Sequence, residues 1–385
     1  TGRTADPATS LAVSAAAILL CRDKALHQAG FLLSFGAVGG ILFAQTFRSR
    51  LLKGTTLGMS MGVQIMTPPV TAYFYYQFPL YNVLLNICVL PLMPFVLGFG
   101  MAGIAGAALN RELGSFVLAP AHYLLKGIAF ACGKLRLLPF AGIVTGQPQP
   151  VKIAAYYAVL FSAMFFCKKF ENGRKNHEFF MKTEKIDLIK CGIAFILLTG
   201  VFFAGEPHAF SMTFLDVGQG DGCCIRNRNH SVWMIDGGSS SESKLAENCV
   251  EPYLKSSGIA RVDYWLISHY DKDHVSALLE MLEGYERGLD GRNAAGITVG
   301  TLLLPDAGEE NEIAEQLLSL AKKQEIPVRF VGKGDIINAG DMTVRILAPQ
   351  RGSAYENSNA SSVVAEVSVG SFKALFTGDV EGTGE

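Results

Sequence analysis

The sequence predicts two structural classes in one chain: a polytopic α-helical membrane domain at 1–205 and an α/β domain, an αββα sandwich, at 206–385. Three observations carry this prediction. Residues 1–205 are rich in long apolar runs and hold 18 Lys+Arg against 7 Asp+Glu, a balance of +11, whereas 206–385 hold 15 against 27, a balance of −12. The 385 residues are too many for one hydrophobic core. In the second half, short apolar runs alternate with amphipathic stretches, which is typical of an α/β fold.

The first half contains a series of candidate membrane spans, because about twenty apolar residues cross a bilayer core. The strongest is 81–109, which carries no charge. The weakest is 115–139, whose three Lys+Arg are also compatible with a helix lying flat at the membrane interface. The predicted spans are 8–21, 27–47, 56–77, 81–109, 115–139, 151–167 and 191–205.

Basic loops predict the orientation of these spans. The loop 168–190 contains seven Lys+Arg, and 48–53 contains three more. Cytoplasmic loops of membrane proteins carry such an excess of positive charge. The span at 191–205 then leads out of the cytoplasm, so we expect a multi-pass protein of the cell membrane with 206–385 on the extracytoplasmic side.

Polar residues and prolines interrupt the predicted spans. Gln28, Gln64, Asn82 and Asn86 are the main polar residues, and the stretch "TPPVTAYFYYQF" breaks a helix at apparent membrane depth. One interpretation is hydrogen bonding between helices. The other is a polar passage, because broken helices are tolerated where they line a cavity. Both interpretations stay open at this point.

The second half predicts strands and helices in alternation. A strand, a Gly-rich turn and a second strand are expected at 210–227. Helices are expected at 250–258, near 275–286 and near 309–324, and the second of them begins just after His274. Eight scattered cysteines without a CxxC pair argue against a zinc finger or a disulfide framework. Further strands are predicted at 231–240, 262–269, 298–306, 328–334, 342–349, 362–370 and 372–381.

The stretch "LISHYDKDHV" places two imidazoles and two carboxylates at the end of a predicted buried strand: His269, Asp271, Asp273 and His274. Imidazole nitrogens and carboxylate oxygens suit zinc, manganese or iron, and the two carboxylates favour harder ions such as manganese. The alternative is a helix start at which Asp273 serves as the N-cap and the other groups are incidental. Four such groups in six residues favour the metal site.

Two more carboxylates follow predicted strands. Asp379 ends the run "ALFTGD", and Asp236 ends "WMID". Gly-Asp and Asp-Gly pairs also occur in ordinary turns. Together with the first cluster, however, Asp379 becomes a candidate bridging ligand, and Asp236 a candidate for orienting a histidine.

The motifs resemble those of the ComEC family of DNA-uptake channels. "FLDVGQGD", "MIDGG", "LISHYDKDH" and "LFTGD" follow in that family's order, and "AGFLLSFGAVGGILF" with "TPPVTAYFYYQFPLYNVLLNICVLP" resembles its competence domain. His269–His274 resembles the HxHxDH signature of the metallo-β-lactamase fold. The resemblance covers nearly the whole chain and implies such a fold for 206–385.

The chain departs from that family in three ways. Leu32 stands where the family often has Gln, and Asp271 stands where the signature usually has a histidine. The family pattern also continues to a later histidine-containing stretch. We therefore expect the sequence to be incomplete at both ends, with the hydrolase domain truncated at its C-terminus.

The resemblance implies a membrane channel for uptake of single-stranded transforming DNA, with a nuclease domain that hydrolyses the phosphodiester bonds of the other strand. Two divalent metal ions, manganese favoured and zinc possible, are expected: His269 and Asp271 on one, Asp273 and His274 on the other, and Asp379 between them. Asp273, His274 and Asp236 are the expected catalytic residues. The expected partners are the DNA substrate, the lipid bilayer, and a DNA receptor and a cytoplasmic ATPase or single-strand-binding protein of a competence machinery; a homo-oligomer is also compatible.

Two alternatives remain beside the nuclease channel. In the first, the hydrolase-like domain only binds DNA or gates the pore, which the altered ligand set allows. In the second, the protein is a membrane-tethered metallo-hydrolase of a small ester or cyclic nucleotide. The balance of −12 in 206–385 is unlike that of a typical nucleic-acid-binding domain and keeps these alternatives open.

Overall fold

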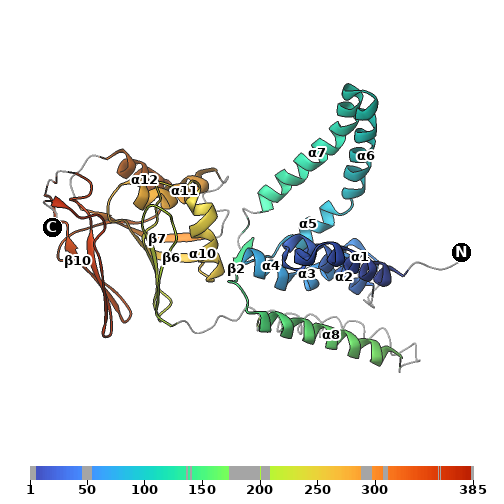
Figure 1. Cartoon of the computed structure of the whole chain (residues 1–385), viewed down its shortest axis with the longest axis horizontal. Coiled ribbons are helices and arrows are strands. Elements are labelled where there is room, and N and C mark those ends of the chain that lie inside the picture. Colours follow the sequence, from blue (N-terminus) through green and yellow to red (C-terminus); the bar gives the residue numbers. More distant parts are fainter. Residues whose placement is uncertain are drawn as a thin grey trace, which may run out of the picture. The chain divides into compact units, whose positions relative to one another are not determined.

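The computed structural model describes residues 6–45, 54–135, 138, 141–172, 200, 209–287, 297–306, 311–353, 355 and 357–382 (Figure 1). The chain divides into two compact units, Thr1–Ala204 and Gly205–Glu385. The predicted span 191–205 apart from residue 200, the basic segment 48–53 and the basic loop from residue 173 onward lie outside the described residues, so the orientation of the chain stays a prediction.

The described part of the first unit consists mainly of helices. Asp6 caps the first of them, because its carboxylate accepts hydrogen bonds from the backbone of Ala8 and Thr9, both at 3.3 Å. A short antiparallel pair joins β1 (Gln77–Pro79) to β2 (Gly142–Val144). The helices are α1 (Pro7–Cys21), a 3₁₀ turn (Asp23–His27), α2 (Ala29–Ala44), α3 (Thr56–Met66), α4 (Pro68–Tyr75), α5 (Asn82–Val89), α6 (Met93–Leu109), α7 (Arg111–Leu135) and α8 (Pro150–Asn172).

The helix lengths give limited support to a polytopic membrane domain. Among the described residues, α7 is by itself long and apolar enough to cross a membrane. The pair α5 and α6 makes a second candidate if it counts as one span, but it is bent by 50°. The sequence analysis took 81–109 as the strongest span and 115–139, which overlaps α7, as the weakest. That ranking is reversed here because composition does not show that the helix at 81–109 is broken near Pro91. The number of spans therefore stays a prediction.

The break between α3 and α4 is held by two tyrosines of α8. Pro69 has no N–H to donate to the Ile65 carbonyl, which a continuous helix would require. The Tyr156 hydroxyl donates to that carbonyl at 2.7 Å, and the Tyr157 hydroxyl donates to the Met66 carbonyl at 2.9 Å. The buried Gln64 amide donates to the Pro79 carbonyl at 3.1 Å. For Gln64, this contact favours the hydrogen-bonding interpretation over a polar passage.

The second unit contains two β-sheets, and the larger one is mixed. Its six strands lie in sequence order. The first three pair antiparallel, and the third also begins a run of four parallel strands. These six strands are β3 (Ser211–Phe214), β4 (Gly222–Arg226), β5 (Val232–Asp236), β6 (Arg261–Leu266), β7 (Thr298–Pro305) and β8 (Val328–Val331). The smaller sheet is antiparallel, in the order β12-β11-β10-β9, with β9 (Ile336–Ala339), β10 (Met342–Ala348), β11 (Val364–Val369) and β12 (Phe372–Phe376).

Two hydrophobic cores lie on the two faces of the six-stranded sheet. Trp233, Ile235 and Leu266 pack toward the smaller sheet, whereas Met234 and Trp265 pack toward the helices. This alternation follows from the two-residue period of a strand. Figure 1 shows α11 (Lys272–Arg287) and α12 (Glu312–Lys323) on one side of β6 and β7, and α10 (Glu251–Ser256) follows a π-helical turn at Ala246–Val250.

These three layers correspond to the first three of the predicted αββα arrangement. Within the described part of this unit, the helices all contribute to the core on one face of the larger sheet, and a second helical layer is not seen. The predicted strands appear. The structure adds β9, which the sequence analysis did not predict, and α11 begins at Lys272 rather than after His274.

Candidate metal centre

The candidate site lies where two neighbouring parallel strands end. β5 ends at Asp236, and β6 ends at Leu266, three residues before His269. The carboxyl ends of parallel strands meet at one edge of a sheet, so both segments reach the same place. His274 follows in the first turn of α11. The fold thus brings residues 236, 269 and 274 together although they come from three elements.

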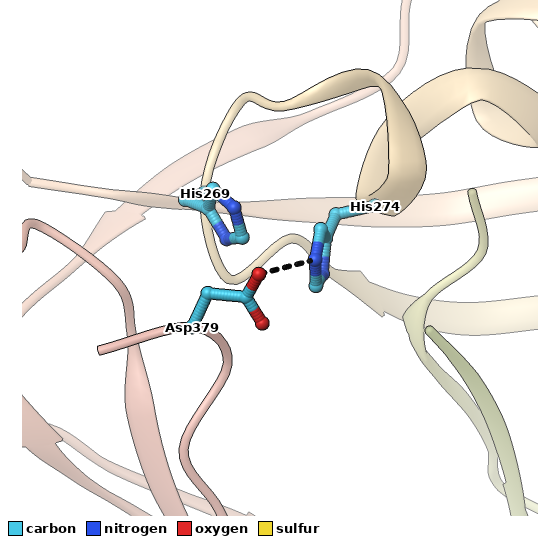
Figure 2. Close-up of side chains that lie close together, drawn as sticks. All are labelled: His269, His274 and Asp379. Carbon is cyan, nitrogen blue, oxygen red and sulfur yellow. Dashed lines mark ion pairs between the residues drawn. The ribbon is translucent and has the colours of Figure 1, made fainter. Parts of the chain in front are cut away.

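His269 and His274 form a buried pair. Their side chains are 0% and 2% exposed, and their ring centroids are 4.0 Å apart. Figure 2 shows both rings beside the carboxylate of Asp379, which comes from the turn after β12. Nε2 of His274 lies 3.5 Å from Oδ2 of Asp379, and ligand atoms of the three residues all lie within 4.8 Å of one another. The sequence assigned all three residues to a metal site, and the structure brings them together.

Asp236 has a different role from these three residues. Its carboxylate is buried; Oδ1 accepts the Ser268 backbone N–H at 2.7 Å, and Oδ2 lies 3.1 Å from Nδ1 of His274. Asp221, Asp236 and His274 also form a compact group. Each Asp236 oxygen has a partner, and Oδ2 is placed to orient the His274 ring. This is the contact that a histidine-orienting residue makes.

Asp271 and Asp273 lie at the edge of the group formed by His269, His274 and Asp379. Oδ2 of the half-exposed Asp271 lies 3.7 Å from Nε2 of His269. The Asp271 carbonyl accepts hydrogen bonds from His274 N and Val275 N, so residue 271, not Asp273, occupies the capping position of α11. Asp273 lies in the first turn of the helix and does not belong to either compact group of potential ligands among the described residues.

The Nε2 nitrogen of His269 is the feature that best fits a metal. It is buried and has no hydrogen-bond partner among the described residues. A buried polar atom without a partner costs about 1–3 kcal/mol. Two imidazoles and a carboxylate match the ligands that zinc and manganese take in proteins. These residues therefore fit one divalent ion, and Asp271 lies close enough to join it.

The pKa values of the two histidines are shifted in opposite directions. Burial and the neighbouring His274 lower the pKa of His269, although nearby carboxylates act against this. Burial also disfavours the charged form of His274, but the hydrogen bond with Asp236 and the charges of Asp236, Asp379 and Asp273 outweigh it and raise its pKa to about 9. Without a metal, a neutral His269 therefore faces a protonated His274 at pH 7.

Sequence reasoning missed three parts of the site. Asp221, at the end of the Gly-rich turn, lies beside Asp236 and His274; burial and the surrounding carboxylates raise its pKa despite the opposing effect of His274. Ser268 lies between the two imidazoles. The loop at 357–363 contacts the motif through a hydrogen bond from Val363 N to the Ser268 carbonyl at 2.8 Å. Its position depends on tertiary structure, because the loop is about 90 residues from the motif in the sequence.

Close backbone contacts hold the motif in place. A Cβ on Gly238 would lie 2.3 Å from His274 N and from Asp273 C, and a Cβ on Gly220 would lie 2.5 Å from the Asp273 carbonyl oxygen. The Asp221 backbone N–H donates to that same oxygen at 3.1 Å. The turns at 220 and 238 therefore touch the start of α11 directly, and glycine is required for this approach.

Gly238→Ala is expected to destabilise the second unit by about 1–3 kcal/mol, because the added methyl group overlaps backbone atoms that cannot move independently. Gly284→Ala in α11 is the matched control. A Cβ there meets nothing within 4 Å, and alanine is the better helix former by about 1 kcal/mol. Urea unfolding followed by tryptophan fluorescence measures both effects. Equal stability of the two variants would contradict the packing described here.

Comparison with protein families gives two matches along the chain. A family model described as "Competence protein" matches residues 1–170, and one described as "Metallo-beta-lactamase superfamily" matches residues 218–286. The second match includes residues 236, 269 and 274. The second unit is therefore a metallo-β-lactamase-fold domain, and this fold implies binding of divalent metal.

Two named proteins are similar to this chain over most of its length. ComE operon protein 3 of Bacillus subtilis (strain 168) is 22% identical over 98% of this chain and 48% of its own length. Competence protein ComA of Neisseria gonorrhoeae is 24% identical over 67% of this chain and 34% of its own length. This chain thus spans about half or less of the length of these relatives. Among solved structures, the metallo-beta-lactamase fold protein YhfI from Bacillus subtilis is 15% identical with a TM-score of 0.30, over 44% of this chain and 62% of that one.

Proposed function

Because this chain joins a competence-protein domain to a metallo-β-lactamase-fold domain and is homologous to ComE operon protein 3 and competence protein ComA, we propose that it takes up transforming DNA. The first unit is the membrane channel for one strand, and the second is a metal-dependent nuclease that hydrolyses the other. The observation that supports the nuclease most is the buried Nε2 of His269, which has no hydrogen-bond partner among the described residues and lies beside His274 and Asp379.

In this proposal some residues of the site bind the metal ions, and Asp236 orients one of the metal-binding side chains. His269, His274 and Asp379 would bind one ion, with Asp271 beside it; Asp273 and Asp379 would contribute to a second. Bound divalent ions would supply the Lewis acid that activates water and stabilises charge on the phosphate during hydrolysis. Asp236 keeps Nδ1 of His274 engaged, so that Nε2 of this ring faces Asp379. No serine, cysteine or threonine nucleophile is needed in this scheme.

The proposal also places the protein in the cell. The basic loop 168–190 is cytoplasmic and the nuclease domain extracytoplasmic, so incoming DNA meets the hydrolase before the membrane. A DNA receptor outside and an ATPase or a single-strand-binding protein inside would complete the transport. The acidic balance of 206–385 means that bound cations supply the positive charge at the site where phosphate arrives.

The direct test is cleavage of DNA by the full chain in lipid nanodiscs. End-labelled single- and double-stranded DNA would be incubated with Mn²⁺, with Zn²⁺ or with chelator, using wild type and Asp273→Ala. The proposal expects metal-dependent cleavage that the variant loses. Binding of DNA without cleavage by a folded, metal-loaded protein would favour a binding or gating module instead. Cleavage that Asp273→Ala retains would remove this residue from the site.

Metal affinity is expected to rise with pH. The pKa of His274 is raised to about 9, so below pH 9 an ion that takes this nitrogen must displace a proton. One displaced proton gives a roughly 10-fold rise in affinity per pH unit, and the rise levels off above about pH 9. His269 adds nothing to this slope near neutrality, since its pKa is lowered. Competition between the full chain and a chelator for Mn²⁺ at pH 6.5, 7.5 and 8.5 measures it; a flat profile would contradict the assignment of His274.

A further inference from the structure

Ser268 lies between the two histidines of the site. It is buried, and its Oγ lies 3.0 Å from Nδ1 of His269 and 3.3 Å from Nδ1 of His274. Its backbone N–H is already fixed by Asp236, and its carbonyl by Val363 N. The hydroxyl is therefore held in contact with the inner nitrogens of both rings, on the side away from the proposed metal position beside Nε2 of each ring.

The proton positions in this network are constrained. An ionised carboxylate can only accept hydrogen bonds, so the contact between Asp236 Oδ2 and His274 places a proton on Nδ1 of His274. That nitrogen cannot also accept the single proton of the Ser268 hydroxyl. Among the hydrogen bonds of the described residues, Nδ1 of His269 is then the acceptor that remains for this hydroxyl.

Two arrangements of His269 follow from this constraint. If Ser268 donates to Nδ1, the proton of the neutral ring resides on Nε2, which then has no lone pair for a cation. If Ser268 instead accepts from Nδ1–H, Nε2 carries a lone pair and faces the group formed with His274 and Asp379. The first arrangement uses the hydroxyl proton. The second reverses the direction of the same hydrogen bond and leaves the hydroxyl proton without an acceptor among the hydrogen bonds of the described residues, in exchange for a metal bond at Nε2.

We propose that Ser268 is a positioning residue whose hydroxyl donates to Nδ1 of His269 in the metal-free protein and accepts from it once a divalent cation binds. The hydroxyl thereby selects the His269 tautomer, and Asp236 does the same for His274 through a fixed carboxylate. The buried Nε2 without a partner is the ring atom that this change of tautomer presents to the ion. The inference rests on the metal site of the proposed function and adds the residue that prepares it.

The test compares Ser268→Thr with Ser268→Val in the full chain. The two side chains have nearly the same shape, but only threonine keeps the hydroxyl. Zn²⁺ and Mn²⁺ affinities would be measured by chelator competition without DNA. Threonine is expected to stay close to wild type and valine to bind about 10–100-fold more weakly, as for other partners of metal-bound histidines. Ser276→Ala removes another buried hydroxyl, one bonded to the backbone of residue 239, and serves as the control.

The tautomer itself is read from ¹⁵N-labelled histidine by solid-state NMR, with diamagnetic Zn²⁺ as the ion. The His269 signals would be assigned through their loss in His269→Gln. In wild type, the Nδ1 signal is expected to change from the unprotonated to the protonated position on addition of Zn²⁺. If Ser268 has only a structural role, the His269 Nδ1 signal should respond to Zn²⁺ in the same way in Ser268→Thr and in Ser268→Val.

The outcomes separate the two proposals. Equal metal affinity and equal tautomers in Ser268→Thr and Ser268→Val would overturn the inference while leaving the metal site intact. If wild type and His269→Gln bind Zn²⁺ equally, the metal site of the proposed function is itself wrong. If the threonine and valine variants both misfold, Ser268→Ala decides by the same two measurements, with weaker binding expected and unchanged binding overturning the inference.

Discussion

Replacing His274 by alanine is expected to abolish metal-dependent DNA cleavage, with a loss of roughly 1,000-fold or more. His274 is the residue that joins the two sides of the site: Nδ1 contacts Asp236 and Nε2 faces Asp379. A bound divalent ion supplies several kcal/mol of charge stabilisation, and losing about 4 kcal/mol of it slows a reaction about 1,000-fold. The variant also leaves the buried Asp236 carboxylate without the cationic partner that offset its burial.

The control for this prediction is another histidine of the same unit. His230 is exposed on the turn between β4 and β5 and has a left-handed backbone with φ +68°. Asparagine tolerates that conformation, so His230→Asn removes an imidazole without strain. Cleavage of labelled DNA by the full chain, with bound metal measured on the same sample, compares the two variants. A His274→Ala protein that still cleaves at the wild-type rate would place the reaction elsewhere.

Much of the second unit's fold follows from sequence pattern because most of its strands are buried on one or both faces. Apolar runs such as 232–236 and 298–305 have few conformations that bury every side chain, and turn residues mark their ends. β9 was not predicted because apolar and polar residue types hardly alternate along its four residues. Their alternating burial arises only when the strand pairs with β10. The start of α11 differs from the prediction because residue 271 occupies the capping position, and this position depends on where the preceding strand ends.

The candidate site was predictable where chemistry is concentrated in sequence. His269 and His274 lie in one short motif whose donors have few other reasons to occur together. Ser268 and Asp221 could not be found in this way, because a serine and a turn aspartate are common and gain their meaning only from tertiary contacts. Asp236 was recognised as ambiguous, and the structure shows which groups occupy its two oxygens.

Contacts across the first unit are likewise beyond the reach of sequence pattern. Hydropathy marks α2 and α3 as apolar but does not show that they touch. Their backbones meet at Gly40 and Gly62: a Cβ on Gly62 would lie 2.1 Å from the Gly40 carbonyl oxygen and 3.0 Å from Cβ of Ala44. Small residues at such crossings let membrane helices approach closely and gain packing energy.

Gly62→Ala is therefore expected to lower DNA uptake by about 10–100-fold while leaving nuclease activity unchanged. The added methyl group overlaps a backbone carbonyl, so the helices must separate, and overpacking of this kind costs about 1–3 kcal/mol. Gly30→Ala is the matched control in α2, because a Cβ there meets nothing within 4 Å. Transformation frequency would be measured in cells that carry each variant, with the amount of protein in the membrane fraction determined in parallel.

The combination of readouts gives this last prediction its weight. A loss of uptake by Gly62→Ala at normal membrane level, with cleavage intact, requires that the first unit conducts DNA by a step separate from hydrolysis. A membrane-tethered hydrolase of a small ester or cyclic nucleotide would show no such loss, because its first unit serves only as an anchor. Equal transformation by Gly62→Ala and Gly30→Ala would therefore contradict the proposed channel, whatever the nuclease does.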